Sequence, residues 1–133
     1  MTRKHLAVLI ALALALPAMA VAAVPSAGKY RGKVVADSGK VSFSVSRDKR
    51  KLLKFTIDGV GATCPAGFQL VTVYVPSARI SRTGRFSAKY KPLKGVDQTV
   101  ELSGRFVTKT RATGTVKAGP LCVYKERWTA RRR

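Results

Sequence analysis

The chain has 133 residues, of which 26 are Lys or Arg and only 6 are Asp or Glu, so its formal net charge at pH 7 is +20. A chain of this length has room for one small domain with a modest core. Its single histidine is His5, in a segment that we expect to be removed. Without it the domain lacks the usual general base, the Ser-His and Cys-His nucleophile pairs and the commonest zinc ligand.

Residues 1–27 have the layout of a secretory signal peptide. A cationic start at 3–5 is followed by an apolar run at 6–16 and by small residues from Pro17 onward. We expect cleavage between residues 20 and 27, a secreted, extracytoplasmic product, and no transmembrane domain after processing. The alternative is an uncleaved anchor, but the strongly apolar run is well short of the roughly 20 residues that span a bilayer.

Residues 28–130 are predicted to form one secreted β-domain, followed by a basic C-terminal tail at 131–133. Removal of Arg3 and Lys4 with the signal peptide leaves a net charge near +18. Apolar and polar residues alternate in several runs of the mature chain, which is the period of a half-buried strand. The clearest runs are 41–45, 53–57, 86–90 and 100–107. In the second of these runs, Leu53, Phe55 and Ile57 are predicted to point inward.

Turn signatures rich in Gly, Asp and Ser separate these runs at short intervals, and no sustained helical period follows the signal peptide. We therefore predict an all-β fold, either an antiparallel β-sandwich or a partly closed barrel of about eight to nine short strands. A Gly, a basic residue and an aromatic residue recur in that order at 28–30, 84–86 and 104–106. This pattern predicts an outward base and an inward ring where another backbone passes closely.

Cys64 and Cys122 are the two cysteines of the chain. In an oxidising compartment an even pair is most simply a disulfide, which we predict here. Two free thiols or an intermolecular bond are the alternatives.

The span from Gly59 to Ala78 carries no basic or acidic residue. We interpret it as a disulfide-tethered loop that leads into a central strand, Leu70 to Val75, buried on both faces. The alternative is an exposed apolar patch that binds a partner.

No pattern of catalytic residues, metal ligands or phosphate-binding glycines is present in the mature chain, so we predict a non-enzyme without cofactor or metal. Glu126 is the one acid that alternation places on an inward face, with Cys122, Tyr124 and Trp128. A buried carboxylate must be paired or protonated. We expect it to bond to an Arg or to lie at a bulge or sheet edge.

Positive charge is the remaining functional signal, because a basic surface attracts polyanions. Two clusters, at 47–54 and 79–94, are expected to merge into one binding surface. The candidate residues are Arg47, Lys49, Arg50, Lys51, Lys54, Arg79, Arg82, Arg85, Lys89, Lys91 and Lys94. The expected partners are anionic wall polymers, anionic lipid surfaces or DNA, bound without specificity, and Tyr74 is the one candidate for stacking on a base.

Two alternatives to polyanion binding remain. The charge is also compatible with a solvated surface that has no ligand, or with a structural or protein-interaction module such as an inhibitor of an extracellular enzyme.

The order of several short motifs resembles a group of small secreted β-proteins of high-GC actinobacteria. The motifs are Gly28-Lys29-Tyr30-Arg31-Gly32, the strand at 41–45, Cys64, Gly84-Arg85-Phe86, Gly104-Arg105-Phe106 with Ala112-Thr113-Gly114-Thr115, Cys122, and Trp128-Thr129-Ala130-Arg131. The resemblance implies a secreted β-fold. The group has no assigned activity, so the resemblance implies no mechanism.

Overall fold

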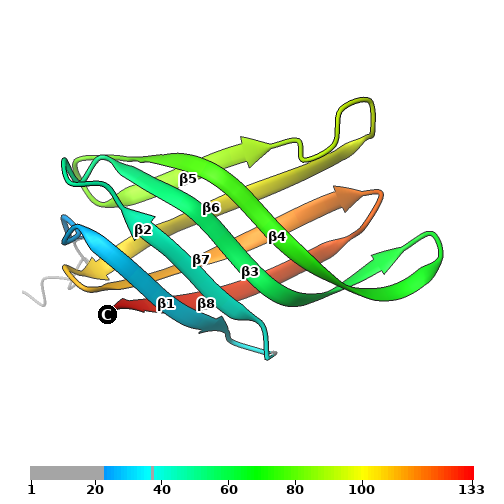
Figure 1. The fold of residues 1–133 in the computed structure, drawn as a ribbon, viewed down its shortest axis with the longest axis horizontal. Helices are drawn as coiled ribbons and strands as arrows, with labels where there is room; N and C mark the ends of the chain where they lie inside the picture. Colours follow the sequence, from blue (N-terminus) through cyan, green and yellow to red (C-terminus); the bar gives the residue numbers. More distant parts are fainter. Residues whose placement is uncertain (1–22, 37) are drawn as a thin grey trace, which may run out of the picture.

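The computed structural model describes residues 23–36 and 38–133, so most of the predicted signal peptide lies outside the described residues. Within them, eight antiparallel strands form one closed barrel in sequence order (Figure 1). The strands are β1 (Gly28–Val34), β2 (Lys40–Val45), β3 (Lys51–Cys64), β4 (Gly67–Ile80), β5 (Arg85–Tyr90), β6 (Gln98–Thr108), β7 (Arg111–Pro120) and β8 (Tyr124–Arg132).

The prediction of an all-β antiparallel fold with about eight strands is confirmed. The sheet closes because β8 pairs with β1 from Tyr30↔Arg132 to Val34↔Trp128. Residues 23–36 and 38–133 include no helix long and apolar enough to cross a membrane.

Aromatic rings fill the middle of the barrel, because every second residue of each strand points inward. Neighbouring rings have centroids 5.0 to 6.4 Å apart, in stacked, tilted and edge-to-face arrangements. The rings belong to Tyr30, Phe43, Phe55, Phe86, Phe106 and Trp128, and all of these residues are buried.

Two glycines make room for two of these rings, those of Phe86 and Trp128. Phe86, Gly104, Gly114 and Trp128 are successive partners across β5 to β8. A Cβ on Gly104 would lie 2.5 Å from Cζ of Phe86, and a Cβ on Gly114 would lie 2.6 Å from Cζ2 of Trp128. Side chains at these two positions would therefore push the rings out of the core.

A bulge at the start of β3 changes which residues point inward. The pairing of β2 with β3 shifts by one residue between Ser42 and Ser44, and Lys54 has a φ of 53°. Leu52 is buried while Leu53 is only half-buried. The prediction that Leu53 faces inward with Phe55 is therefore wrong, because an extra residue in a bulge exchanges the two faces of the strand.

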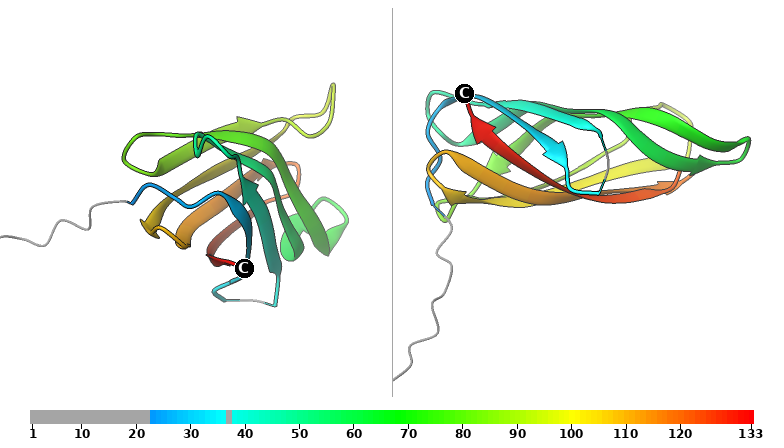
Figure 2. Two further views of the ribbon diagram at one scale, coloured as in Figure 1. Left: turned by 60° about the vertical axis from the view of Figure 1, so that its left-hand side comes forward. Right: turned by 90° about the horizontal axis from the view of Figure 1, so that it is seen from below.

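The strand Leu70 to Val75 is not buried on both faces, which corrects the interpretation of the neutral span. Val73 and Val75 are buried, but Leu70 and Tyr74 are exposed. The reason is that an antiparallel barrel leaves the outer face of every strand to solvent. The β3–β4 hairpin also extends past the end of β2, to the far end of the barrel (Figures 1 and 2).

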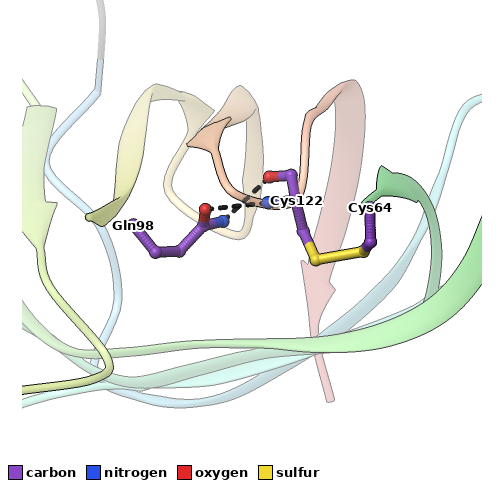
Figure 3. The surroundings of a disulfide bond; sticks show 3 residues. All are labelled: Cys64, Gln98 and Cys122. Atoms are coloured by element: carbon purple, nitrogen blue, oxygen red, sulfur yellow. Dashed lines mark hydrogen bonds between the residues drawn. A yellow bond between two sulfur atoms is a disulfide. The ribbon is translucent and has the colours of Figure 1, made fainter. Parts of the chain in front are cut away.

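A disulfide and a buried glutamine hold this far end together. Cys64 and Cys122 form the predicted bond, with their Cα atoms 4.2 Å apart, and it joins the β3–β4 hairpin to the β7–β8 turn. Gln98 lies beside it at the start of β6 (Figure 3). Its Nε2 donates to the carbonyl oxygen of Cys122 at 2.8 Å, and the amide of Cys122 donates to its Oε1 at 3.0 Å.

We expect Gln98→Leu to lower the free energy of unfolding by about 1–3 kcal/mol, because both backbone groups of Cys122 would lose their partners in a part-buried site. Urea denaturation measures the change. Gln69→Leu is the matched control, since Gln69 is exposed and its replacement should change stability by less than about 0.5 kcal/mol. Equal effects of the two substitutions would contradict this role for Gln98.

Both termini of the described chain are hydrogen-bonded to the end of the barrel opposite the disulfide. The amides of Ala23 and Ser26 donate to the carbonyl oxygens of Phe106 and Lys109, each at 2.7 Å. At the other terminus, part of the expected basic tail is strand: β8 continues to Arg132. Described residues on both sides of the predicted domain 28–130 are therefore hydrogen-bonded to the barrel.

Candidate anion-binding groove

Five neighbouring strands, β4 to β8, place one polar side chain each in a single row on the outside of the barrel. The row consists, in strand order, of Arg79, Ser87, Ser103, Thr115 and Arg127, each paired with the next. Partners in adjacent strands point to the same side of a sheet, and none of the five is buried. The row therefore has a guanidinium group at each end and hydroxyl groups between them.

A second row, Arg85, Arg105 and Thr113, runs beside the first on β5, β6 and β7. Together the two rows line a shallow hollow of about 870 Å³ over the backbone of Gly104 and Gly114. We call this hollow the basic groove. It is defined by Arg79, Arg85, Arg105 and Arg127 with the hydroxyl groups of Ser81, Ser87, Ser103, Thr113 and Thr115.

The groups in the basic groove suit an anion. Guanidinium groups stay charged at any physiological pH, and their planar forks match the oxygen atoms of phosphate or carboxylate. The hydroxyl groups of Ser103 and Thr115 lie 2.9 Å apart in a shared hydrogen bond, so one hydrogen remains to be donated outward. No carboxylate lines the groove in the described part of the chain. The charged side chains that line the groove are therefore all positive.

A second basic hollow, of about 720 Å³, adjoins the groove and shares Arg79 and Ser81 with it. It lies between the β2–β3 and β4–β5 turns, which are held side by side by a hydrogen bond of 2.7 Å from the amide of Ile80 to the carbonyl oxygen of Arg50. Its basic residues are Lys49, Arg50, Lys51, Arg79 and Arg82.

One carboxylate, that of Asp48, lines this second hollow. It accepts hydrogen bonds from the hydroxyl group of Ser46 and from the backbone amide of Arg50. These two bonds hold the pKa of the Asp48 carboxyl below its ordinary value. The Asp48 carboxylate therefore stabilises the β2–β3 turn through these two hydrogen bonds.

The predicted clusters at 47–54 and 79–94 merge only in part. The structure brings together Lys49, Arg50, Lys51, Arg79, Arg82 and Arg85. The remaining candidates lie elsewhere: Arg47 at the outside of the β2–β3 turn, Lys54 on the bulge, Lys89 in an ion pair of 3.6 Å with Glu101, and Lys91 and Lys94 in the β5–β6 loop at the far end.

Arg105 and Arg127 were not among the candidates, yet they form half of the arginine set in the groove. A signal for each was present in the sequence, because each base stands beside an aromatic residue that is buried, Phe106 and Trp128. Alternation alone predicts that both point outward. What it does not predict is that their strands lie next to β5 and β7.

The charge is distributed unevenly around the barrel. On β2, β3 and β4 the outward row Ser42, Thr56 and Tyr74 is neutral. On β1, β8 and β7 the corresponding row is Arg31, Arg131 and Arg111, which extends the basic surface away from the groove. The predicted stacking candidate, Tyr74, stands in the neutral row, and its ring packs edge-to-face on Tyr90 with centroids 6.3 Å apart.

Glu126 is half-buried and on the same face of β8 as Tyr124 and Trp128, which confirms its predicted inward orientation. No arginine in the described residues forms a salt bridge with it, so of the arrangements expected for Glu126 the arginine pair is not formed. In the same part of the chain, no three His, Cys, Asp or Glu side chains come together as a metal site would require.

No family model, curated protein or solved structure matches this chain. The resemblance to secreted β-proteins of actinobacteria stays a prediction.

Proposed function

We propose that this protein binds extended polyanions, without catalysis, through the basic groove and the basic surface beside it. The observation that carries the proposal is the convergence of four arginines from β4, β5, β6 and β8 on one hollow that no carboxylate of the described chain lines. A surface selected only for solubility intersperses both signs of charge. Here the outward row Ser42, Thr56 and Tyr74 on β2 to β4 is neutral, whereas four arginines gather in the groove.

The shape of the groove favours a polymer over a single small anion. Its first row crosses five strands, which at about 4.8 Å per strand spacing is about 19 Å, enough for several repeating charges. The one aromatic residue that lines it, Phe86, is buried, so no ring is offered for stacking on a base. Contacts to charge alone position a ligand without reading its sequence.

We further propose that the protein acts outside the cytoplasm, where its natural ligand is an anionic polymer of the cell envelope. The disulfide supports this location, since such bonds persist in oxidising compartments. The signal-peptide layout of residues 1–27 supports it independently.

Salt dependence tests the proposal. Inorganic polyphosphate and two DNA duplexes of unrelated sequence serve as probes in fluorescence-anisotropy titrations. Four neutralised phosphates give a slope of roughly −3 in log affinity against log salt, so affinity should fall roughly 50- to 150-fold between 50 and 200 mM salt. The two duplexes should bind equally. Binding that is unchanged in molar salt, or that separates the two duplexes, would refute the proposal.

A further inference from the structure

The far end of the barrel exposes apolar side chains in a fixed arrangement. Phe68 and Leu70 on β4 are 74% and 69% exposed, and Val123 at the entry to β8 is 54% exposed. Thr63 pairs with Phe68 on one side and with Val123 on the other, so the two apolar side chains flank it on the outer face. The disulfide beneath them joins the two segments.

This end also projects from the molecule. The β3–β4 hairpin extends farthest, and the β5–β6 loop and the β7–β8 turn lie at the same end (Figures 1 and 2). These two connections expose Leu93 and Leu121 in addition. The three connections at the opposite end do not carry a comparable apolar set.

Basic side chains surround the apolar ones. Lys91 and Lys94 lie in the β5–β6 loop beside Leu93, and Lys125 follows Val123 on β8. The described residues of this end include one acid in a loop, Asp97. The surroundings of the apolar side chains are therefore positive on balance.

We propose that this end of the barrel docks on an anionic lipid surface, with Phe68, Leu70 and Val123 inserted at the level of the headgroups. The transfer of exposed apolar side chains from water into such a surface has a favourable free energy, and lysine side chains beside them reach the lipid phosphates. The groove lies on the side of the barrel and not at this end, so the inference does not rest on the proposed polymer binding.

Charge and area argue against a second copy of the chain as the occupant. Two copies that met through this end would bring their lysines together. A few protruding side chains also supply far less than the roughly 800 Å² per partner of a standard protein interface. A lipid surface imposes neither requirement.

The double variant Phe68→Ser, Leu70→Ser tests the docking by co-sedimentation with vesicles of phosphatidylglycerol and phosphatidylcholine. We expect its partition constant to fall at least about tenfold, because two exposed apolar side chains no longer insert. Val24→Ser, Val107→Ser is the matched control, since both valines are exposed and follow Ala23 and Phe106, which are bonded to each other at the opposite end. Thermal melting should show both variants folded, and polyphosphate binding should be unchanged in both.

Insertion itself is read from the indole that Phe68→Trp introduces, because the native Trp128 is buried and does not meet the lipid. Its emission should shift to the blue with anionic vesicles and stay constant with protein concentration alone. The proposal is overturned if the emission is insensitive to vesicles, if it shifts on concentration alone, which indicates self-association, or if vesicles of phosphatidylcholine alone bind as well. It is also overturned if the Phe68→Ser, Leu70→Ser variant binds vesicles like the wild type, which indicates purely electrostatic adsorption.

Discussion

Replacement of both cysteines by serine should lower the free energy of unfolding by about 4 kcal/mol. The bond joins residues 58 positions apart, and in the chain-entropy model its removal releases a loop of that length in the unfolded state. Small domains are stable by only about 5–15 kcal/mol in total, so the loss is a large share. Guanidinium denaturation of Cys64→Ser, Cys122→Ser against the wild type measures it.

The position of the bond adds a local expectation. Beyond the end of β2, the tip of β3 pairs with β4 and, through the single bridge from Thr63 to Val123, with the approach to β8. The exchange of amide hydrogens in this tip should therefore be much faster in the Cys64→Ser, Cys122→Ser variant than in the wild type. The exchange of amide hydrogens in β6 and β7 should increase much less. Treatment of the wild type with reductant should reproduce the variant, and the variant should not respond to reductant. A stability within about 1 kcal/mol of the wild type would contradict the account.

Neutralising the basic groove should have the largest effect on binding. The variant Arg79→Gln, Arg85→Gln, Arg105→Gln, Arg127→Gln removes the four guanidinium groups and should lower the affinity for polyphosphate at least about a hundredfold at 50 mM salt. The slope of log affinity against log salt should flatten by about 3, because close to one counterion is released per neutralised phosphate. No salt bridge in the described residues involves these arginines, so the fold should be retained.

A control variant of equal charge separates the groove from the net charge. Arg47→Gln, Lys54→Gln, Lys91→Gln, Lys94→Gln also removes four positive charges, but from exposed positions outside the groove. It should lower the affinity only a few fold, because these charges act from a distance and are screened. Equal losses in the two variants would mean that net charge, and not the groove, attracts the ligand.

Local features of the fold were predictable because strands impose a period of two. The inward faces at 41–45 and 100–107, the inward Glu126 and the outward bases of the Gly-base-aromatic motifs all follow from alternation. The disulfide followed from the even number of cysteines and the expected compartment. The bulge at Lys54 did not follow, since nothing in a run of alternating residues marks where one extra residue is inserted.

The groove and the projecting end depend on long-range pairing, which a single sequence does not reveal. Arg79 and Arg127 face the same hollow only because β4 to β8 are neighbours in one register. Phe68 and Leu70 are exposed because β3 and β4 are longer than β2 and extend past its end. The uncharged run Leu70 to Val75 predicts a strand buried on both faces, whereas the mismatch in strand lengths brings Leu70 into solvent.

The most direct test of the groove is a map of the residues that polyphosphate contacts. In a ¹⁵N-edited NMR titration at low salt, amide shifts should concentrate at Ser87, Ser103 and Thr115 on the groove row. The neutral row of Ser42 and Thr56 should remain unperturbed. Shifts spread evenly over both rows, or confined to β2 and β3, would contradict polyanion binding in the basic groove.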